Sequence, residues 1–197
     1  MTILTSMLVF LSALSAGTNF PASMSEKEKT CLLTVWQRTL PSDEEKQFDM
    51  DNDVDIDGLF YSCENNISAS ELQNSLTKIK MAIKNDDEQT FASMLSYPLY
   101  YLIKKEKPDN KGSITESRTI NSPSEIDQHY KNIVTPEFKD VMACAAVNKF
   151  SVLENFDILL ARGFIHFELD KTYDEVKISG VGVFVKNQQN WYEKYCQ

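Results

Sequence analysis

Two periodicities of apolar residues run through this chain, one typical of helices and one typical of strands. The strand pattern is clearest over residues 156–184, where two β-branched and aromatic runs, FDILLARGFIHFE and EVKISGVGVF, flank a short polar link. Such runs predict a long antiparallel hairpin in the middle of a sheet, with a bend near Gly163. We expect the upstream segments to pack onto this hairpin.

A second hairpin is predicted before it. LYYLIKK at 99–105 is typical of a strand, DNKGS at 109–113 of a turn, and ITESRTI at 114–120 of a partner strand at a half-exposed sheet edge. One more strand is predicted near residues 149–153.

Helical spacing marks other segments. One helix is predicted to begin at the N-cap Ser70. Its apolar residues are Leu72, Leu76, Ile79 and Ile83. A second helical stretch ends ahead of Pro98. Its apolar residues are Phe91, Met94 and Leu95.

Two further helix starts and an acidic stretch complete the pattern. A hydroxyl residue before proline, at Ser122 and again at Thr135, predicts a helix N-terminus because the hydroxyl caps and proline fits the first turn. Residues 25–40 predict a short helix. The acidic residues 41–58 after it have little to bury, so we expect a surface loop there.

This succession of elements predicts an α+β fold, with a curved antiparallel sheet, helices packed on one face and a short helical leader. We expect a signal peptide over residues 1–22, a helix with an acidic loop over 23–67, and the main domain over 68–197.

The main domain resembles the nuclear transport factor 2-like family of cone-shaped, cystatin-like α+β domains. The resemblance rests on SYPLYY, INSPSEIDQHYKNIVTPEFKDVM and FDILLARGFIHFE followed by EVKISGV, and covers residues 70–185. Within the family it is similar to exported bacterial members with a YxxIxTPEF segment. The resemblance implies a bent sheet around a pocket and dimers formed through the open sheet face. It does not imply one function, since members include isomerases, dehydratases, transport and scaffold proteins, and immunity or inhibitor proteins.

The N-terminal stretch MTILTSMLVFLSALSAG has an apolar core over residues 3–14 followed by small residues. It predicts a secretory signal, and the alternative is a membrane-anchoring or buried helix. No other segment approaches the length of a membrane span, so we expect a periplasmic or secreted protein with no membrane span after cleavage.

Four cysteines remain after the predicted signal, an even number in a chain that we expect to be exported. Two disulfides are predicted, and three pairings are open. We favour Cys31 with Cys63 and Cys144 with Cys196, because each pair would fasten a terminal segment to the body. Metal-binding thiols are disfavoured because no two cysteines stand at a ligand spacing.

The charge balance narrows the class of partner. The chain has 20 basic and 29 acidic residues, a net charge of -9, and no charged residue in its first 25 positions. Nucleic acid is not expected as a partner because phosphate binding needs a concentrated basic surface. A basic protein or a cation suits this charge better.

The most specific local motif is DVDIDGLFYSCE at residues 53–64, which matches the spacing of a calcium-binding loop. Its predicted Ca²⁺ ligands are Asp53, Asp55, Asp57, the carbonyl of Leu59, and Glu64. The segments on either side lack the expected helix pattern, so the alternative is a solvated acidic loop fastened at Cys63.

The chain has two histidines, His129 and His166, and neither has a nucleophile or carboxylate at catalytic spacing. A pocket enzyme or small-molecule carrier would use His166 and Arg162 with Asp127 or Glu168. For most sheet histidines the role is structural, so no catalytic set is predicted.

The favoured prediction is an exported, non-catalytic binding protein that holds another protein, such as a periplasmic immunity or inhibitor protein. Its predicted contact residues are the aromatics Tyr101, Trp191, Tyr192 and Tyr195. Tyr97 and Tyr100 are available too, but we expect packing roles for them. A homodimer is expected from the resemblance.

Overall fold

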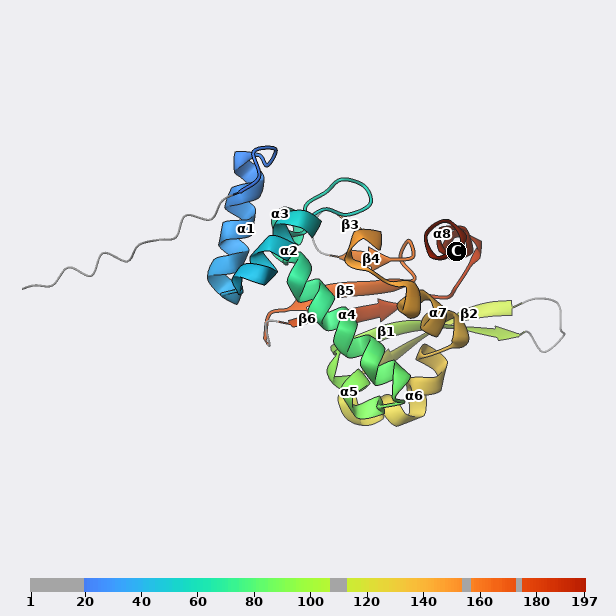
Figure 1. The fold of residues 1–197 in the computed structure, drawn as a ribbon. Coiled ribbons are helices and arrows are strands. Elements are labelled where there is room, and N and C mark those ends of the chain that lie inside the picture. The colour runs from blue at the N-terminus through green and yellow to red at the C-terminus, as the bar shows by residue number, and fades with distance from the viewer. Residues whose placement is uncertain (1–19, 107–112, 154–156, 173–174) are drawn as a thin grey trace, which may run out of the picture.

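The computed structural model describes residues 20–106, 113–153, 157–172 and 175–197, and over these ranges it is an α+β structure (Figure 1). The helices are α1 (Glu26–Thr39), α2 (Asp43–Asn52), α3 (Tyr61–Asn65), α4 (Ala69–Lys84), α5 (Glu88–Ser93), α6 (Ile126–Ile133), α7 (Pro136–Cys144) and α8 (Lys186–Cys196). The strands are β1 (Leu95–Glu106), β2 (Ser113–Ile120), β3 (Phe150–Val152), β4 (Ile158–Leu160), β5 (Ile165–Asp170) and β6 (Glu175–Val181). Within these ranges, no helix has the length and hydropathy needed to cross a bilayer. The predicted signal peptide lies outside the described residues, apart from 20–22.

The six strands form one sheet in the order β2-β1-β6-β5-β4-β3. Neighbouring strands are antiparallel except for β1 and β6, which run parallel, so the expected antiparallel sheet is corrected to a mixed one. The long connection through β2, α6, α7, β3, β4 and β5 brings β6 back beside β1 in the same direction. The helices and the single sheet confirm the α+β class. The sheet is not closed, so the cone implied by the resemblance is not confirmed.

The stretch predicted as one hairpin contains three strands. β5 and β6 form the expected antiparallel hairpin, although Phe156 and part of the link lie outside the described residues. The predicted bend at Gly163 is a reversal between β4 and β5, because Ala161, Arg162 and Gly163 all adopt positive φ, at 51°, 54° and 85°. Three successive left-handed residues turn the chain back within one tight turn.

Helices α4 to α7 supply the core that covers one face of the sheet, and α4 crosses that face diagonally in Figure 1. Edge-to-face ring contacts run from Tyr130 through Phe91 and Phe138 to Phe164, with centroids 5.4 to 6.2 Å apart. These buried aromatics join α5, α6 and α7 to the start of β5.

The acidic stretch after the first helix is not only a loop, as we expected, since α2 lies within it. Ser42 and Glu45 form a capping box that satisfies the first backbone N–H groups of α2. Its Asp49 is fully buried and accepts hydrogen bonds from Trp36 Nε1 and the Ser70 backbone N–H, each at 2.7 Å. This side chain of α2 therefore connects α1 to α4.

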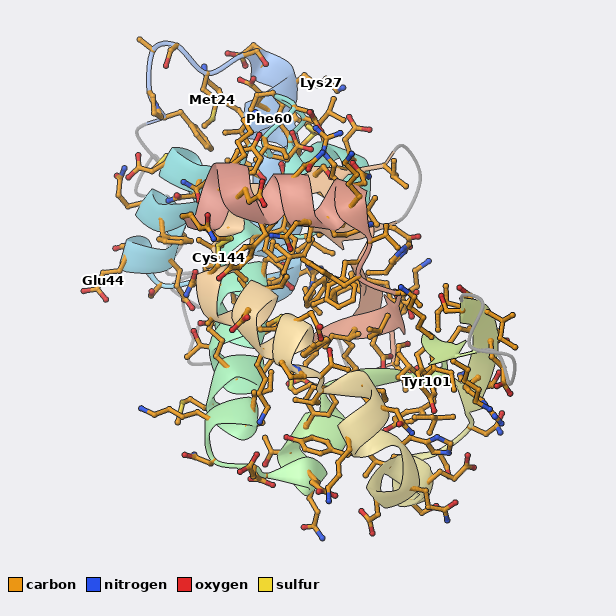
Figure 2. The ribbon with its side chains drawn as sticks, turned by 90° about the vertical axis from the view of Figure 1, so that its right-hand side faces the viewer. Met24, Lys27, Glu44, Phe60, Tyr101 and Cys144 are labelled. Atoms are coloured by element: carbon orange, nitrogen blue, oxygen red, sulfur yellow. A yellow bond between two sulfur atoms is a disulfide. The ribbon has the colours of Figure 1, made fainter. Side chains whose placement is uncertain are left out.

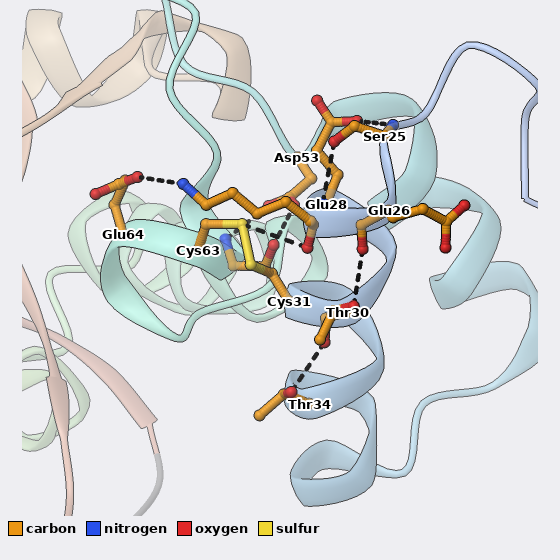
Figure 3. Close-up of a disulfide and its surroundings, with 11 residues drawn as sticks. Ser25, Glu26, Glu28, Thr30, Cys31, Thr34, Asp53, Cys63 and Glu64 are labelled. Carbon is orange, nitrogen blue, oxygen red and sulfur yellow. Dashed lines mark hydrogen bonds and ion pairs between the residues drawn. A yellow bond between two sulfur atoms is a disulfide. The ribbon is translucent and has the colours of Figure 1, made fainter.

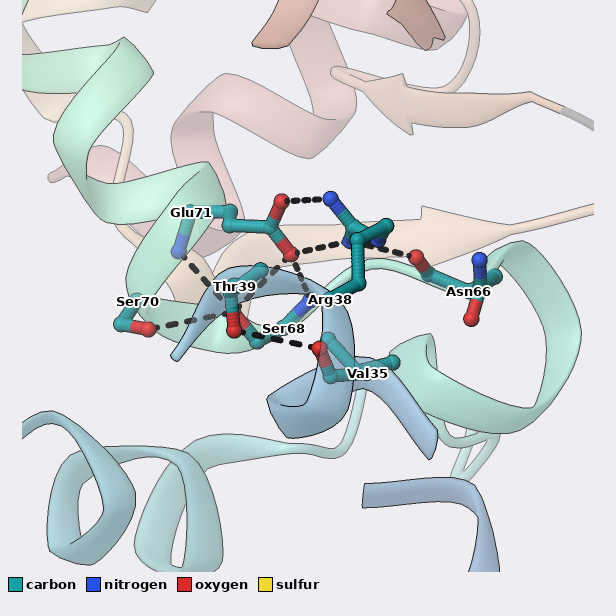
Figure 4. A network of polar contacts seen from close by, with 7 residues as sticks. All are labelled: Val35, Arg38, Thr39, Asn66, Ser68, Ser70 and Glu71. Carbon is teal, nitrogen blue, oxygen red and sulfur yellow. Dashed lines mark hydrogen bonds and ion pairs between the residues drawn. The ribbon is translucent and has the colours of Figure 1, made fainter. Parts of the chain in front are cut away.

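The first turn of α4 is a second connection to the N-terminal segment (Figure 4). Ser68, not Ser70 as expected, is its N-cap and forms a capping box with Glu71. Glu71 also accepts two hydrogen bonds from the Arg38 guanidinium of α1, at 2.7 and 2.8 Å. A bidentate pair of this kind fixes the direction of both side chains.

The remaining helix and strand boundaries follow the sequence closely. α1 has its predicted start at Ser25, and α7 has its predicted cap at Thr135. The predicted helix before Pro98 ends earlier, because Leu95 already belongs to β1. Both favoured disulfides are confirmed: Cys31 bonds to Cys63 and Cys144 to Cys196, which fastens α1 to α3 and α8 to α7.

Candidate partner-binding face

The sheet face opposite the helices carries exposed apolar side chains of β1. Leu99 and Tyr101 point into the core and are buried, whereas Tyr100 is 58% exposed and Leu102 is 39% exposed. Successive side chains of a strand point to opposite faces, so Tyr100 and Leu102 lie together on the outer face. We call this outer surface of β1, β6 and β5 the open face.

A shallow groove of about 410 Å³ lies on the open face beside these two residues. It is lined by Tyr100, Leu102, Asp157, His166, Glu168 and Gly180, among others. Gly180 pairs with Tyr100 on one side and with His166 on the other. Because it has no side chain, the floor of the groove stays open between these two rings.

His166 is held in place by acceptors on both sides of its ring. Its Nδ1 lies 3.4 Å from Asp157 Oδ2, and its Nε2 lies 3.1 Å from the carbonyl oxygen of Gly163. A carboxylate and a carbonyl only accept, so both contacts are hydrogen bonds when the ring carries both protons. In this geometry both ring nitrogens face oxygen atoms of the protein.

The other residues of the alternative catalytic set lie elsewhere. Arg162 is exposed in the β4–β5 turn and borders a separate hollow of about 200 Å³ with Asp57. Asp127 is exposed on α6. Glu168 borders the groove with His166 and accepts a hydrogen bond from Ser96 at 2.5 Å. The structure therefore brings His166 and Glu168 to one groove, without Arg162 or Asp127.

The aromatics predicted for contact are mostly packed inside. Tyr101 and Trp191 are each 2% exposed, and Tyr192 and Tyr195 are partly buried against the core. The Tyr101 hydroxyl lies 2.6 Å from His129 Nδ1 of α6, which gives His129 a structural partner. Tyr101 is labelled in Figure 2. Tyr100 presents its ring to solvent instead. The alternation along LYYLIKK was the signal for this, since the two adjacent tyrosines must point to opposite faces.

The calcium-like loop uses its oxygens internally. Asp53 accepts hydrogen bonds from the Ser62 backbone N–H and hydroxyl, and Asp55 accepts from the N–H groups of Asp57, Leu59 and Val152. The Leu59 carbonyl accepts from the Asp55 N–H.

The two remaining predicted ligands point elsewhere. Asp57 is exposed, and Glu64 lies 3.9 Å from Lys27 of α1 (Figure 3). Among the described residues, no group of three or more His, Cys, Asp or Glu side chains is placed to hold a metal ion. The predicted ligands do not converge on one point here, and calcium binding stays a prediction.

Burial changes the chemistry of one carboxyl in this loop. Desolvation raises the pKa of Asp53 to about 7, even though both hydrogen bonds from Ser62 act to lower it. Asp53 is 3% exposed, so its charged form has little contact with water.

Comparison with known proteins adds no family to this geometry. No protein-family model matches the chain, and no curated protein or solved structure matches it either.

Proposed function

We propose that this protein is an exported, non-catalytic binding protein that holds a partner protein on the open face of its sheet. The observation that carries the proposal is the exposed pair Tyr100 and Leu102 beside the groove. Exposed tyrosine next to an aliphatic side chain and a concave polar surface is typical of the centre of a protein interface.

Two features of the chain support export. Two disulfides are consistent with an oxidising compartment outside the cytoplasm, and the apolar N-terminal stretch agrees with a signal sequence. The net charge of -9 favours a basic partner. A periplasmic immunity or inhibitor protein of the nuclear transport factor 2-like type, which neutralises a basic effector, would combine these features.

The alternative, a pocket enzyme or small-molecule carrier, has less support. His166 borders the groove, but both of its ring nitrogens face acceptors within the protein. Arg162 and Asp127 would have to move to reach it.

The proposal is tested by affinity capture from the envelope fraction of the parent cell with immobilised, disulfide-intact protein. We expect one protein in stoichiometric amount, and a loss of affinity on the order of tenfold or more for Tyr100→Arg. The matched control is Met81→Arg, because Met81 of α4 is also 58% exposed but lies on the helical side. Equal recovery by both variants, or recovery of no stoichiometric protein, would refute the proposal.

A further inference from the structure

The strand β2 has an open outer edge. Among the strands that the structure describes, it pairs with β1 alone, from Ser113 opposite Glu106 to Ile120 opposite Leu99. Every side chain from Ser113 to Thr119 is exposed or half-buried, and only Ile120 is buried. An exposed edge of this length presents unpaired backbone N–H and C=O groups that can pair with another strand.

The sequence of this edge is symmetric about its centre. Residues 114–120 read ITESRTI, so isoleucine and threonine recur at equal distances on either side of Ser117. The only difference between the two halves is one of charge, since Glu116 on one side corresponds to Arg118 on the other. In an antiparallel pair of identical strands centred on Ser117, isoleucine therefore faces isoleucine, threonine faces threonine and serine faces serine. Glu116 faces Arg118.

We propose that two copies of this chain associate by antiparallel pairing of their β2 strands about a twofold axis at Ser117. Each Glu116 then lies opposite Arg118 of the second copy, twice in one interface. Opposite charges directly across an antiparallel pair attract, and like charges repel. A twofold axis gives each copy the same contacts and closes the assembly at two.

Neighbouring registers are selected against. A twofold axis perpendicular to the sheet must pass at a residue, because only then do facing side chains share one side of the sheet. An axis at Glu116 would place two glutamates face to face, and an axis at Arg118 would place two arginines face to face. The axis at Ser117 avoids both.

The same charges already interact within one copy. Glu116 forms ion pairs with Lys105, at 2.5 Å, and with Arg118, and the three side chains are between 34% and 47% exposed. They are therefore held on one side of the hairpin and remain accessible from its outer edge. Pairing would continue one sheet through both copies and place their open faces on the same side. The dimer is therefore independent of the proposed binding function.

Charge reversal tests the register. In sedimentation equilibrium we expect the parent to dimerise with rising concentration and Glu116→Arg or Arg118→Glu alone to raise the dimer Kd at least about tenfold. An equimolar mixture of the two single variants should form a heterodimer, because every cross-strand pair is then attractive. The double variant Glu116→Arg with Arg118→Glu should dimerise like the parent.

The mixture also controls for folding, since misfolded single variants could not recover a dimer together. A parent that stays monomeric at the highest attainable concentration would overturn the proposal, and so would a dimer that ignores these charges.

A cysteine pair tests the position of the axis. Residues facing each other at the axis have Cα atoms about 4.5 to 5.5 Å apart, within the range of a disulfide. Ser117→Cys should therefore yield a disulfide-linked dimer under a mild thiol oxidant. Thr115→Cys, equally exposed on the same side of the strand, should not, because its two copies would lie about 13 Å apart. Equal crosslinking of both variants would refute an axis at Ser117.

Discussion

Asp53 and Ser62 form a buried pair in which the carboxylate accepts hydrogen bonds from the Ser62 backbone N–H, at 2.9 Å, and from the Ser62 hydroxyl. Asp53 caps the C-terminal end of α2, and Ser62 belongs to α3, so the pair joins two helices of the N-terminal segment. The disulfide between Cys31 and Cys63 lies next to it (Figure 3).

This pair should make stability depend on pH. The pKa of Asp53 is raised from 3.8 to about 7 in the folded protein, so the folded state holds a proton that the unfolded state releases above about pH 4. The proton held by folded Asp53 therefore makes its full contribution to the free energy of unfolding below about pH 4. As the pH rises from about 4 to about 7, this contribution is lost, and the free energy of unfolding falls; above pH 7 it no longer changes with this group. Asp53→Asn, which can keep both contacts without a charge, should remove this dependence.

The measurement is urea unfolding of parent and variant across this pH range. We expect Asp53→Asn to be more stable than the parent above pH 7 and equal to it below pH 4. Asp57→Asn, in the exposed part of the same loop, should follow the parent curve throughout. A constant difference between Asp53→Asn and the parent at all pH values would contradict the assignment.

Asp55 should be the residue that holds the acidic loop to the sheet. Its carboxylate accepts three backbone hydrogen bonds, one of them from Val152 of β3 at 2.6 Å. Asp55→Ala leaves three backbone N–H groups without this acceptor, and the hydrogen bond from Val152 among them is buried, so we expect the free energy of unfolding to fall by about 2 to 4 kcal/mol. Asp57→Ala is the matched control and should unfold like the parent in urea. An equal fall in the free energy of unfolding of both variants would show that the Asp55 hydrogen bonds are not its cause.

Calcium should contribute little to the stability of this loop. The carboxylates of Asp53 and Asp55 already have protein donors, and a cation would have to replace those hydrogen bonds. We expect the same melting temperature in excess EDTA and in millimolar CaCl₂. A rise in Tm with CaCl₂ that Asp57→Asn abolishes would instead establish a calcium site.

Each disulfide should stabilise a different end of the chain, and each end carries its own tryptophan. Trp36 lies in α1 with Cys31, and Trp191 lies in α8 with Cys196. Replacing Cys144 and Cys196 by serine should cost about 2 to 4 kcal/mol and shift Trp191 fluorescence to the red as α8 loosens. Replacing Cys31 and Cys63 should shift Trp36 instead.

The two signals are separated in Trp36→Phe and Trp191→Phe backgrounds. A red shift of the same tryptophan in both disulfide variants would show that the ends do not loosen independently.

Much of the fold was predictable because its signals are local. The caps at Ser25 and Thr135 lie within three residues of the N–H groups they satisfy, and the β-branched residues that mark β6 as a strand all lie within it. The disulfide pairing followed from the positions of the cysteines near the two ends. The helix α2 was missed, although its Ser42 and Glu45 capping box was visible in the sequence, because its few apolar residues indicated a loop.

The sequence by itself predicted the α+β class and the β1–β2 and β5–β6 hairpins, since these depend on neighbouring residues. It favoured, among three open pairings, the two disulfides that the structure contains. Only the tertiary structure decided that β1 lies parallel to β6, that Tyr101 faces α6 while Tyr100 faces solvent, and that Asp53 meets Ser62. These arrangements depend on contacts between segments far apart in the chain. The free energy of such contacts comes from burial and from satisfying buried polar groups, which no local pattern encodes.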